Sequence, residues 1–160
     1  MAMLLPIGSY NVNIRHMAPR RRRAAIARTR QSEEAHIAFD PMRHTAPALA
    51  GFFRITEVWG ADNAQTMAML GQPSARTFYR WKAGDVAALP NDVIRRIGYV
   101  SGIWKALQLL YSNPKQSDEW VRKPNRFFGG QTPLERMSAG DVTDLAAVRQ
   151  YLDAARAPWS

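Results

Sequence analysis

The sequence contains no cysteine, and this absence excludes structural disulfides, thiolate catalysis and zinc sites built from cysteine. No apolar run approaches the roughly 20 residues that a membrane-spanning helix needs, and the stretch Met1–Ile7 is too short for the core of a signal peptide. Alternating runs of β-branched residues, which are typical of strands, are also missing. We therefore expect an all-α protein that is cytoplasmic and has no membrane partner.

Groups suited to catalysis are scarce as well. The three histidines, His16, His36 and His44, lie near the N-terminus, where we expect no packed neighbours to orient them for proton transfer or metal binding. No glycine-rich phosphate loop follows a strand, and Asp118 and Glu119 are adjacent in sequence rather than convergent. The sequence therefore predicts no enzyme, no catalytic residue, no metal site and no cofactor.

Acidic residues are few relative to basic ones. The 160 residues include 22 Lys and Arg against 13 Asp and Glu, and the resulting net charge of +9 favours acidic partners. Eight of the basic and three of the acidic residues fall within residues 1–46, where the tract Arg20–Arg23 has only Ile26 as a bulky apolar neighbour. Because burial there cannot offset chain entropy, we predict that residues 1–46 are a basic, disordered tail.

Two points about this tail stay open. It is either simply solvated or in nonspecific contact with phosphates. The dipeptide His16-Met17 resembles the join left by a common cloning site, so residues 1–16 are either a cloning remnant or native.

From residue 47 onward the sequence contains the start, stop and spacing signals of helices. A helix is predicted from Pro47 to Gly60, with one apolar face. Asp62 forms a capping box with Gln65 at the start of a short helix that reaches Leu70. The residues on the apolar face of the first helix are Leu49, Phe52, Phe53, Thr56 and Trp59.

A second short helix is predicted directly after the first. Ser74 can cap a helix that reaches Ala83, and Gly71-Gln72-Pro73 forms a tight turn between the two. Two short helices joined by such a turn are typical of a helix-turn-helix, which we place within residues 47–88.

The second helix of this pair is the candidate DNA reader. Phe78 and Trp81 are three residues apart and are predicted to face the core. Arginine can bind guanine edges bidentately, and hydroxyl groups can contact phosphates, so the outward face suits operator DNA. The alternative is an ordinary helical hairpin whose arginines keep one face soluble. The outward residues are Arg76, Thr77, Tyr79 and Arg80.

Residues 89–160 are predicted to form a second domain. Its longest helix starts at Pro90 or Asn91 and runs to about Ser112, with an apolar stripe broad enough to need cover on two sides. This breadth motivates a homodimer. Further helix starts are predicted at Asn113-Pro114, at Thr132, which forms a capping box with Glu135, and at Asp141, whose helix reaches about Arg156.

One C-terminal segment is too particular for a generic loop. It contains Trp120, then Pro124-Asn125, Phe128-Gly129 and Thr132-Pro133, and the chain closes with Tyr151-Leu152-Asp153-x-x-Arg156. These motifs resemble the toxin-binding domain of the Xre/MbcA/ParS family of bacterial antitoxins, and the resemblance extends from roughly Phe52 to Trp159 because that family begins with an Xre-like helix-turn-helix.

The resemblance implies a type II antitoxin. Its partner would be a RES-domain toxin that degrades NAD or transfers ADP-ribose, and its C-terminal domain would block the toxin's active site. It also implies autoregulation by binding the promoter, association with the nucleoid when bound there, and a dimer within a larger toxin–antitoxin complex. The toxin-binding residues implied are Trp120, Asn125, Phe128, Tyr151, Arg156 and Trp159, with Leu134 and Leu152 also at motif positions.

Several of these residues have an alternative structural interpretation. Asn125 can brace a turn, Trp120 and Phe128 can be core aromatics, and Arg156 can be a cation at a helix C-terminus. The sequence departs from the family where Ala157-Pro158 stands in place of the glycine that many relatives have. The alternative function is a plain helix-turn-helix regulator with a C-terminal dimerisation domain and no toxin.

Overall fold

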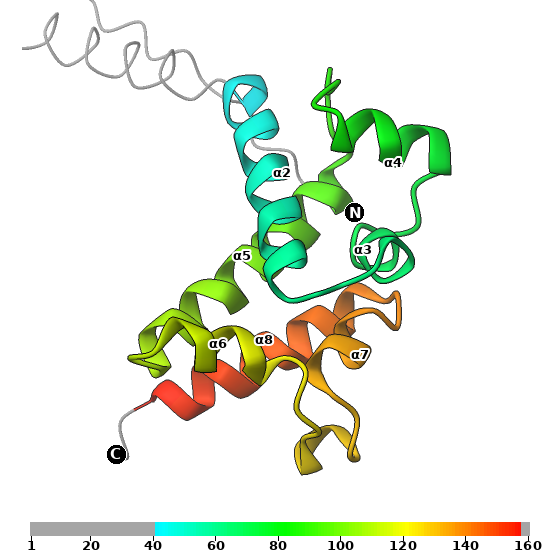
Figure 1. The fold of residues 1–160 in the computed structure, drawn as a ribbon. Coiled ribbons are helices and arrows are strands. Elements are labelled where there is room, and N and C mark those ends of the chain that lie inside the picture. The colour runs from blue at the N-terminus through cyan, green and yellow to red at the C-terminus, as the bar shows by residue number, and fades with distance from the viewer. Residues whose placement is uncertain (1–40, 158–160) are drawn as a thin grey trace, which may run out of the picture. The chain divides into compact units, whose positions relative to one another are not determined.

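Proline and capping residues set where the helices begin in the computed structural model, which describes residues 41–157 and side chains from residue 44 onward. Every regular element among these residues is helical, as Figure 1 shows, so the predicted all-α class is confirmed. Residues 1–40 of the predicted tail and Trp159 lie outside the described residues. The elements are α2 (Pro41–Val58), α3 (Asn63–Met69), α4 (Ala75–Lys82), α5 (Asn91–Leu110), α6 (Pro114–Trp120), η2 (Arg126–Phe128), α7 (Pro133–Met137) and α8 (Val142–Arg156).

The first described helix begins earlier than predicted. The predicted start at Pro47 is wrong, because α2 begins at Pro41 and contains Pro47 in its interior, so residues 41–46 of the predicted tail are helical. Pro41 is an equally suitable first residue, since a proline at the first helical position loses no hydrogen bond. The apolar face is as predicted, with Leu49, Phe52 and Trp59 at most 1% exposed.

The helix-turn-helix geometry is confirmed at its caps and its turn. Asp62 and Gln65 form the predicted capping box of α3, and the Ser74 side chain accepts a hydrogen bond at the start of α4. In the turn between them, Gly71 and Gln72 both have positive φ, at 86° and 60°. This left-handed backbone reverses the chain at the position that the sequence predicted.

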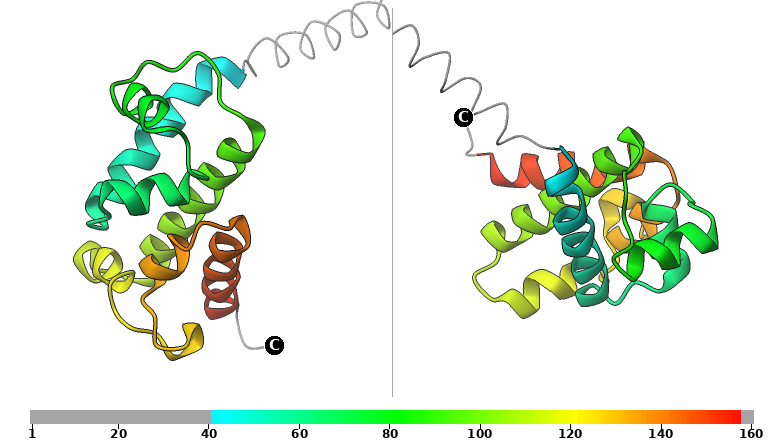
Figure 2. Two further views of the ribbon diagram at one scale, coloured as in Figure 1. Left: turned by 90° about the vertical axis from the view of Figure 1, so that its right-hand side faces the viewer. Right: turned by 90° about the horizontal axis from the view of Figure 1, so that it is seen from above.

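The long helix α5 is covered on two sides by its own chain. Its strongest contacts are with α8 and α2, and α6 adds further cover. Figure 2 shows α5 running from the part that holds α2–α4 into the part that holds α6–α8. The predicted need for cover is therefore met largely within the chain, although Ile94, Trp104 and Leu109 stay exposed.

The C-terminal helices also begin at the predicted caps. The side chains of Asn113, Thr132 and Asp141 accept backbone hydrogen bonds at the starts of α6, α7 and α8, and Thr132 forms its capping box with Glu135. The buried residues of α8 are Asp144, Leu145, Val148 and Leu152.

The buried side chain of Arg96 joins the two halves of the described region. Its Nε donates to Asp92 Oδ2 at 2.7 Å and its Nη1 donates to the Gly140 carbonyl at 3.0 Å. It also packs against Gly71, where an added Cβ would lie 3.0 Å from Arg96 Nε. Arg96 therefore fixes both the helix-turn-helix turn and the turn before α8 on α5.

One continuous core underlies all of these helices, from Leu49 on α2 to Leu152 on α8. Residues 41–160 group accordingly into one unit, so the boundary at residue 88 stays a proposed division by function. No helix of the described residues is both long and apolar enough to cross a membrane. Within residues 41–157 no group of three or more potential metal ligands comes together.

Candidate functional site

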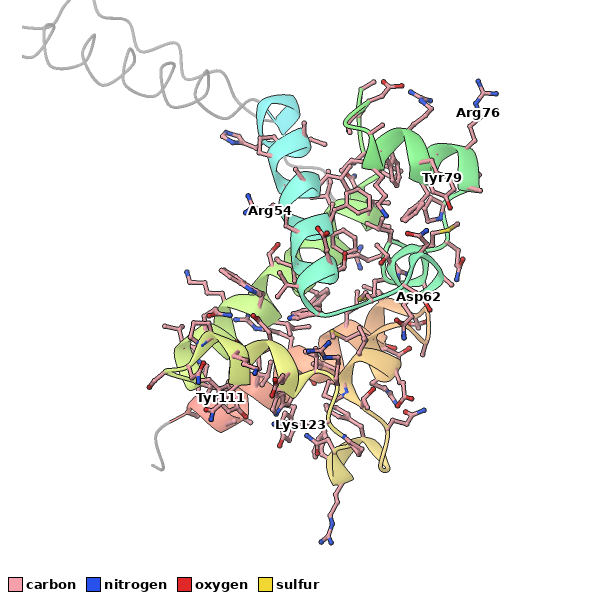
Figure 3. The ribbon with its side chains drawn as sticks, in the orientation of Figure 1. Arg54, Asp62, Arg76, Tyr79, Tyr111 and Lys123 are labelled. Carbon is pink, nitrogen blue, oxygen red and sulfur yellow. The ribbon has the colours of Figure 1, made fainter. Side chains whose placement is uncertain are left out.

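The helix α4 presents the predicted DNA-contacting residues on one exposed face. Phe78 is fully buried and Trp81 half-buried, so the predicted inward face is confirmed. Figure 3 shows Arg76 pointing away from α4 into solvent, whereas Tyr79 lies between α4 and α3. The face therefore offers a free guanidinium next to a phenol that α3 partly holds.

Two of the four predicted residues are already engaged within the chain. Thr77 is half-buried, and its hydroxyl accepts a hydrogen bond from Ser74 Oγ at 2.9 Å, which makes it part of the α4 cap. Arg80 Nε donates to Asp85 Oδ2 at 2.8 Å. This hydrogen bond and the charge attraction behind it lower the pKa of the Asp85 carboxyl and raise the pKa of Arg80.

A side-chain bridge that the sequence did not reveal orders the helix pair. Lys82 Nζ donates to Asn63 Oδ1 at 2.9 Å, and Asn63 Nδ2 donates to the Tyr79 hydroxyl at 3.5 Å. The first residue of α3 is thus tied to the second half of α4. Separations of 16 and 19 residues fit no helical period, so no sequence pattern signals this bridge.

The second candidate site is a group of aromatic rings around Tyr151 on α8, called here the aromatic cluster: Trp120, Phe127, Phe128 and Tyr151. Trp120 stacks on Tyr151 with ring centroids 5.9 Å apart and an interplanar angle of 22°. Phe127 and Phe128 contact the same ring at 4.9 and 5.4 Å. The end of α6 and the nearby η2 therefore meet α8, which is distant from both in sequence, at one tyrosine.

The loop that carries the two phenylalanines is closed on itself by Asn125. The Asn125 side chain accepts from the Phe127 N–H at 2.9 Å, and its backbone N–H donates to the Gln131 carbonyl at 3.0 Å. The Asn125 carbonyl also accepts from Gly130 at 3.0 Å. Asn125 thus braces the turn, as its structural interpretation predicted, and the loop holds its phenylalanines in fixed positions.

The two phenylalanines of this loop face opposite environments. Phe128 is 7% exposed and belongs to the core, whereas Phe127 is 68% exposed. Trp120 and Tyr151 are half-buried, and Leu134 and Leu152 are buried. Phe127 was not among the predicted site residues, because an aromatic doublet alone does not show which ring faces outward.

Tyr111, the residue that ends α5, extends the cluster. Burial raises the pKa of its phenol, and the nearby Tyr151 raises it further. Figure 3 places Tyr111 at the far end of α5. Its phenol is therefore neutral at physiological pH, and the surface beside Tyr151 gains no negative charge from it.

Cations adjoin the aromatic cluster along the chain. Lys123 and Arg126 are exposed in the loop, and Arg156 ends α8. Lys123 Nζ lies 3.9 Å from Glu119 Oε2 and Arg156 Nη1 lies 3.7 Å from Asp153 Oδ1, and both distances are long for ion pairs. Exposed pairs of this kind are weak, so these cations remain available to an acidic partner.

The structure does not join Arg156 to the aromatic cluster. It follows Tyr151 by five residues, a rotation of about 140° around a helix with 3.6 residues per turn. Its place in the last turn of α8 fits the interpretation as a helix C-terminal cation. The predicted residues Trp120, Phe128 and Tyr151 thus come together, while Arg156 lies apart from them.

Comparisons with known proteins agree with this geometry. Residues 106–157, which include every ring of the aromatic cluster and Arg156, match the model of the "Antitoxin Xre/MbcA/ParS C-terminal toxin-binding domain". A protein of Sinorhizobium fredii described as "Uncharacterized protein y4oB" is 37% identical over 126 residues, which cover 73% of this chain and 97% of the relative. No solved structure matches the chain significantly. The chain belongs to the Xre/MbcA/ParS antitoxin family and carries that family's C-terminal toxin-binding domain.

Proposed function

We propose that this chain is the antitoxin of a type II toxin–antitoxin pair, and that its toxin is a RES-domain protein that degrades NAD or transfers ADP-ribose from it. The observation that carries the proposal is the aromatic cluster with its 68% exposed Phe127, which lies within the matched toxin-binding segment. Exposed aromatic side chains on a rigid support are typical anchors of protein interfaces.

In this proposal the C-terminal part covers the toxin's active cleft. Phe127 inserts into an apolar part of the cleft, and Tyr151 and Trp120 support it. Arg156, with a planar fork of donors, pairs with an acidic catalytic group or takes the place of a cofactor phosphate. Trp159 adds a further contact, while Asn125 and Phe128 shape the loop from inside.

Deleting the residues from Ala155 onward tests this arrangement. We expect the shortened chain to lose toxin neutralisation when both proteins are co-expressed, because Arg156 and Trp159 are removed. Promoter binding should persist, since α2–α4 are untouched. Full rescue of growth by the shortened chain would contradict the cleft-blocking mechanism.

The same chain is proposed to repress its own operon as a homodimer that places one α4 in each half-site of the promoter. Binding there would associate the protein with the nucleoid. Arg76 and Arg80 read bases, while Thr77 and Tyr79 contact phosphates or thymine methyl groups. Titrating the promoter fragment with Arg76→Ala and Arg80→Ala chains should show a loss of about 1–3 kcal/mol at a contacted base pair. If both variants bind the promoter with unchanged affinity, α4 is not the recognition helix.

A plain regulator without a toxin is the competing proposal. It accounts for α4 but gives the exposed Phe127 no role. The two proposals differ in their genetic neighbour, because an antitoxin requires an adjacent reading frame for a RES-type protein. Co-purification of that neighbour with this chain supports the antitoxin, and a neighbour that expresses without harm in its absence supports the regulator.

A further inference from the structure

The turn that ends α4 holds Asp85 close to the candidate recognition face. Gly84 has φ of 88° and donates its N–H to the Trp81 carbonyl at 3.0 Å, and Asp85 donates its N–H to the Arg80 carbonyl at 3.0 Å. This pair of bonds is the Schellman arrangement, which needs a left-handed residue and therefore favours glycine. The backbone of Asp85 is thus fixed against the last turn of α4.

The side chain of Asp85 also bonds to Arg80, the residue that its backbone N–H contacts. Asp85 Oδ2 accepts from Arg80 Nε at 2.8 Å, so a backbone bond and a side-chain bond both join the two residues. The pair remains accessible to a ligand, because the Arg80 and Asp85 side chains are 51% and 64% exposed.

Neither helix stability nor attraction to DNA explains an acid at this position. A carboxylate beside a helix C-terminus faces the negative end of the helix dipole, which is the unfavourable end. A carboxylate next to a DNA-contacting arginine also repels phosphates. What the carboxylate does supply is a fixed orientation for the Arg80 guanidinium.

We infer that Asp85 is a positioning residue that determines specificity, holding Arg80 so that its Nη donors face a guanine edge. The inference rests on the proposed DNA-binding function of α4. A guanidinium has five donors in a rigid fork. With Nε occupied by Asp85, both Nη groups can reach O6 and N7 of guanine, and the side chain loses less conformational freedom on binding.

This role and a purely electrostatic one predict different results when the carboxylate is removed. If Asp85 only repels DNA, Asp85→Ala binds every duplex more tightly and keeps its base preferences. If Asp85 positions Arg80, the variant keeps or raises its affinity for random DNA but loses its preference for guanine at one base pair of each half-site.

The experiment uses the full chain in three forms: unaltered, Asp85→Ala, which removes both the charge and the acceptor, and Asp153→Ala. The last is a matched control, because Asp153 accepts from Arg149 Nε on α8 at the same 2.8 Å. Preferred sites are selected from random-sequence duplexes with the unaltered chain. The affinity of each form is then measured for the selected duplex and for duplexes in which one guanine at a time is replaced.

We expect the unaltered chain and Asp153→Ala to discriminate roughly 5- to 100-fold at the base pair read by Arg80, the range for a bidentate arginine–guanine contact. Asp85→Ala should discriminate less than about twofold at that base pair, while its preferences at the other base pairs and its thermal unfolding are unchanged. That loss at a single position supports the inference.

Two results overturn the inference alone. One is undiminished discrimination by Asp85→Ala, and the other is an equal loss of affinity for all duplexes, which indicates a merely structural role. A different result overturns the proposed DNA-binding function as well: the unaltered chain selects no sequence at all. The two failures are therefore distinguishable within one experiment.

Discussion

At the scale of single residues, burial separates scaffold from contact within the aromatic cluster. Phe127 and Phe128 are neighbours in the sequence, yet one is 68% and the other 7% exposed. The sequence motifs singled out Trp120, Phe128 and Tyr151, and the structure brings their rings together, while their role in toxin binding stays a prediction. The sequence did not indicate Phe127, because the outward direction depends on how Asn125 closes the loop.

Phe127→Ala should weaken toxin binding without weakening the fold. Removing an exposed anchor aromatic from an interface typically costs about 2 kcal/mol or more, whereas an exposed side chain contributes little to folding. The affinity of the purified chain for its toxin and its thermal midpoint measure the two effects. Leu109→Ala is the matched control, since Leu109 is 61% exposed but lies on α5 outside the aromatic cluster. Equal affinities for both variants would remove Phe127 from the interface.

Asp141 makes the stability of α8 depend on pH. Its carboxylate accepts from the Thr143 N–H at 2.7 Å, and this hydrogen bond, followed by that of the Thr143 hydroxyl, lowers the pKa of Asp141. A lowered pKa in the folded state stabilises the fold above the ordinary carboxyl pKa. The stabilisation disappears as the pH falls through the lowered value.

Asp141→Ala should therefore unfold at a lower temperature than the unaltered chain at neutral pH, and the difference should shrink as the pH falls below about 4. Asp141→Asn serves as the control, because its side chain can still cap the helix but does not titrate. Thermal unfolding followed by circular dichroism between pH 7 and pH 3 measures the difference. A difference between Asp141→Ala and the unaltered chain that stays constant with pH would refute the role of the charge.

At the scale of elements, helix starts that have a side-chain cap were more predictable than the start of α2, which is marked by proline alone. Caps at Asp62, Ser74 and Thr132 act through their own neighbours, so the sequence alone located them. The start of α2 at Pro41 was not predicted, because both Pro41 and Pro47 are compatible with a helix start. Which proline starts the helix depends on the surrounding structure, and the periodicity of apolar residues gives no information about it.

Two glycines of α5, Gly98 and Gly102, differ in whether the packing leaves room for a side chain. An added Cβ at Gly98 would meet no atom within 4 Å, whereas at Gly102 it would collide with the guanidinium of Arg149. Gly98→Ala should raise the free energy of unfolding by about 0.5–1 kcal/mol, because alanine loses less backbone entropy in a helix.

Urea denaturation of both alanine variants checks this expectation. Gly102→Ala should gain less, since Arg149 must move away from Asp153 to make room. Light scattering on the same samples shows whether the surface at Gly98 serves self-association. If the Gly98→Ala chain has a lower free energy of unfolding or self-associates less than the unaltered chain, the surface at Gly98 is not open to solvent.

At the scale of the whole molecule, two sites with different chemistry share one continuous core. The α4 face carries arginines and hydroxyl groups, and the aromatic cluster carries an exposed phenyl ring beside cations. Arg96 contacts turns from both halves, with its Nη1 bonded to the Gly140 carbonyl 44 residues away. The sequence predicted the two sites separately, but a contact over that separation has no local signal.

The central claim is that the aromatic cluster and the end of α8 inhibit a toxin independently of α4. Its most direct measurement is the NAD consumption of the RES-type protein from the adjacent reading frame, titrated with three forms of this chain. The unaltered chain and the Arg76→Ala, Arg80→Ala double variant should both inhibit it stoichiometrically, and the Phe127→Ala, Tyr151→Ala double variant should require far higher concentrations. Equal inhibition by all three forms, or no inhibition by the unaltered chain, would contradict the account.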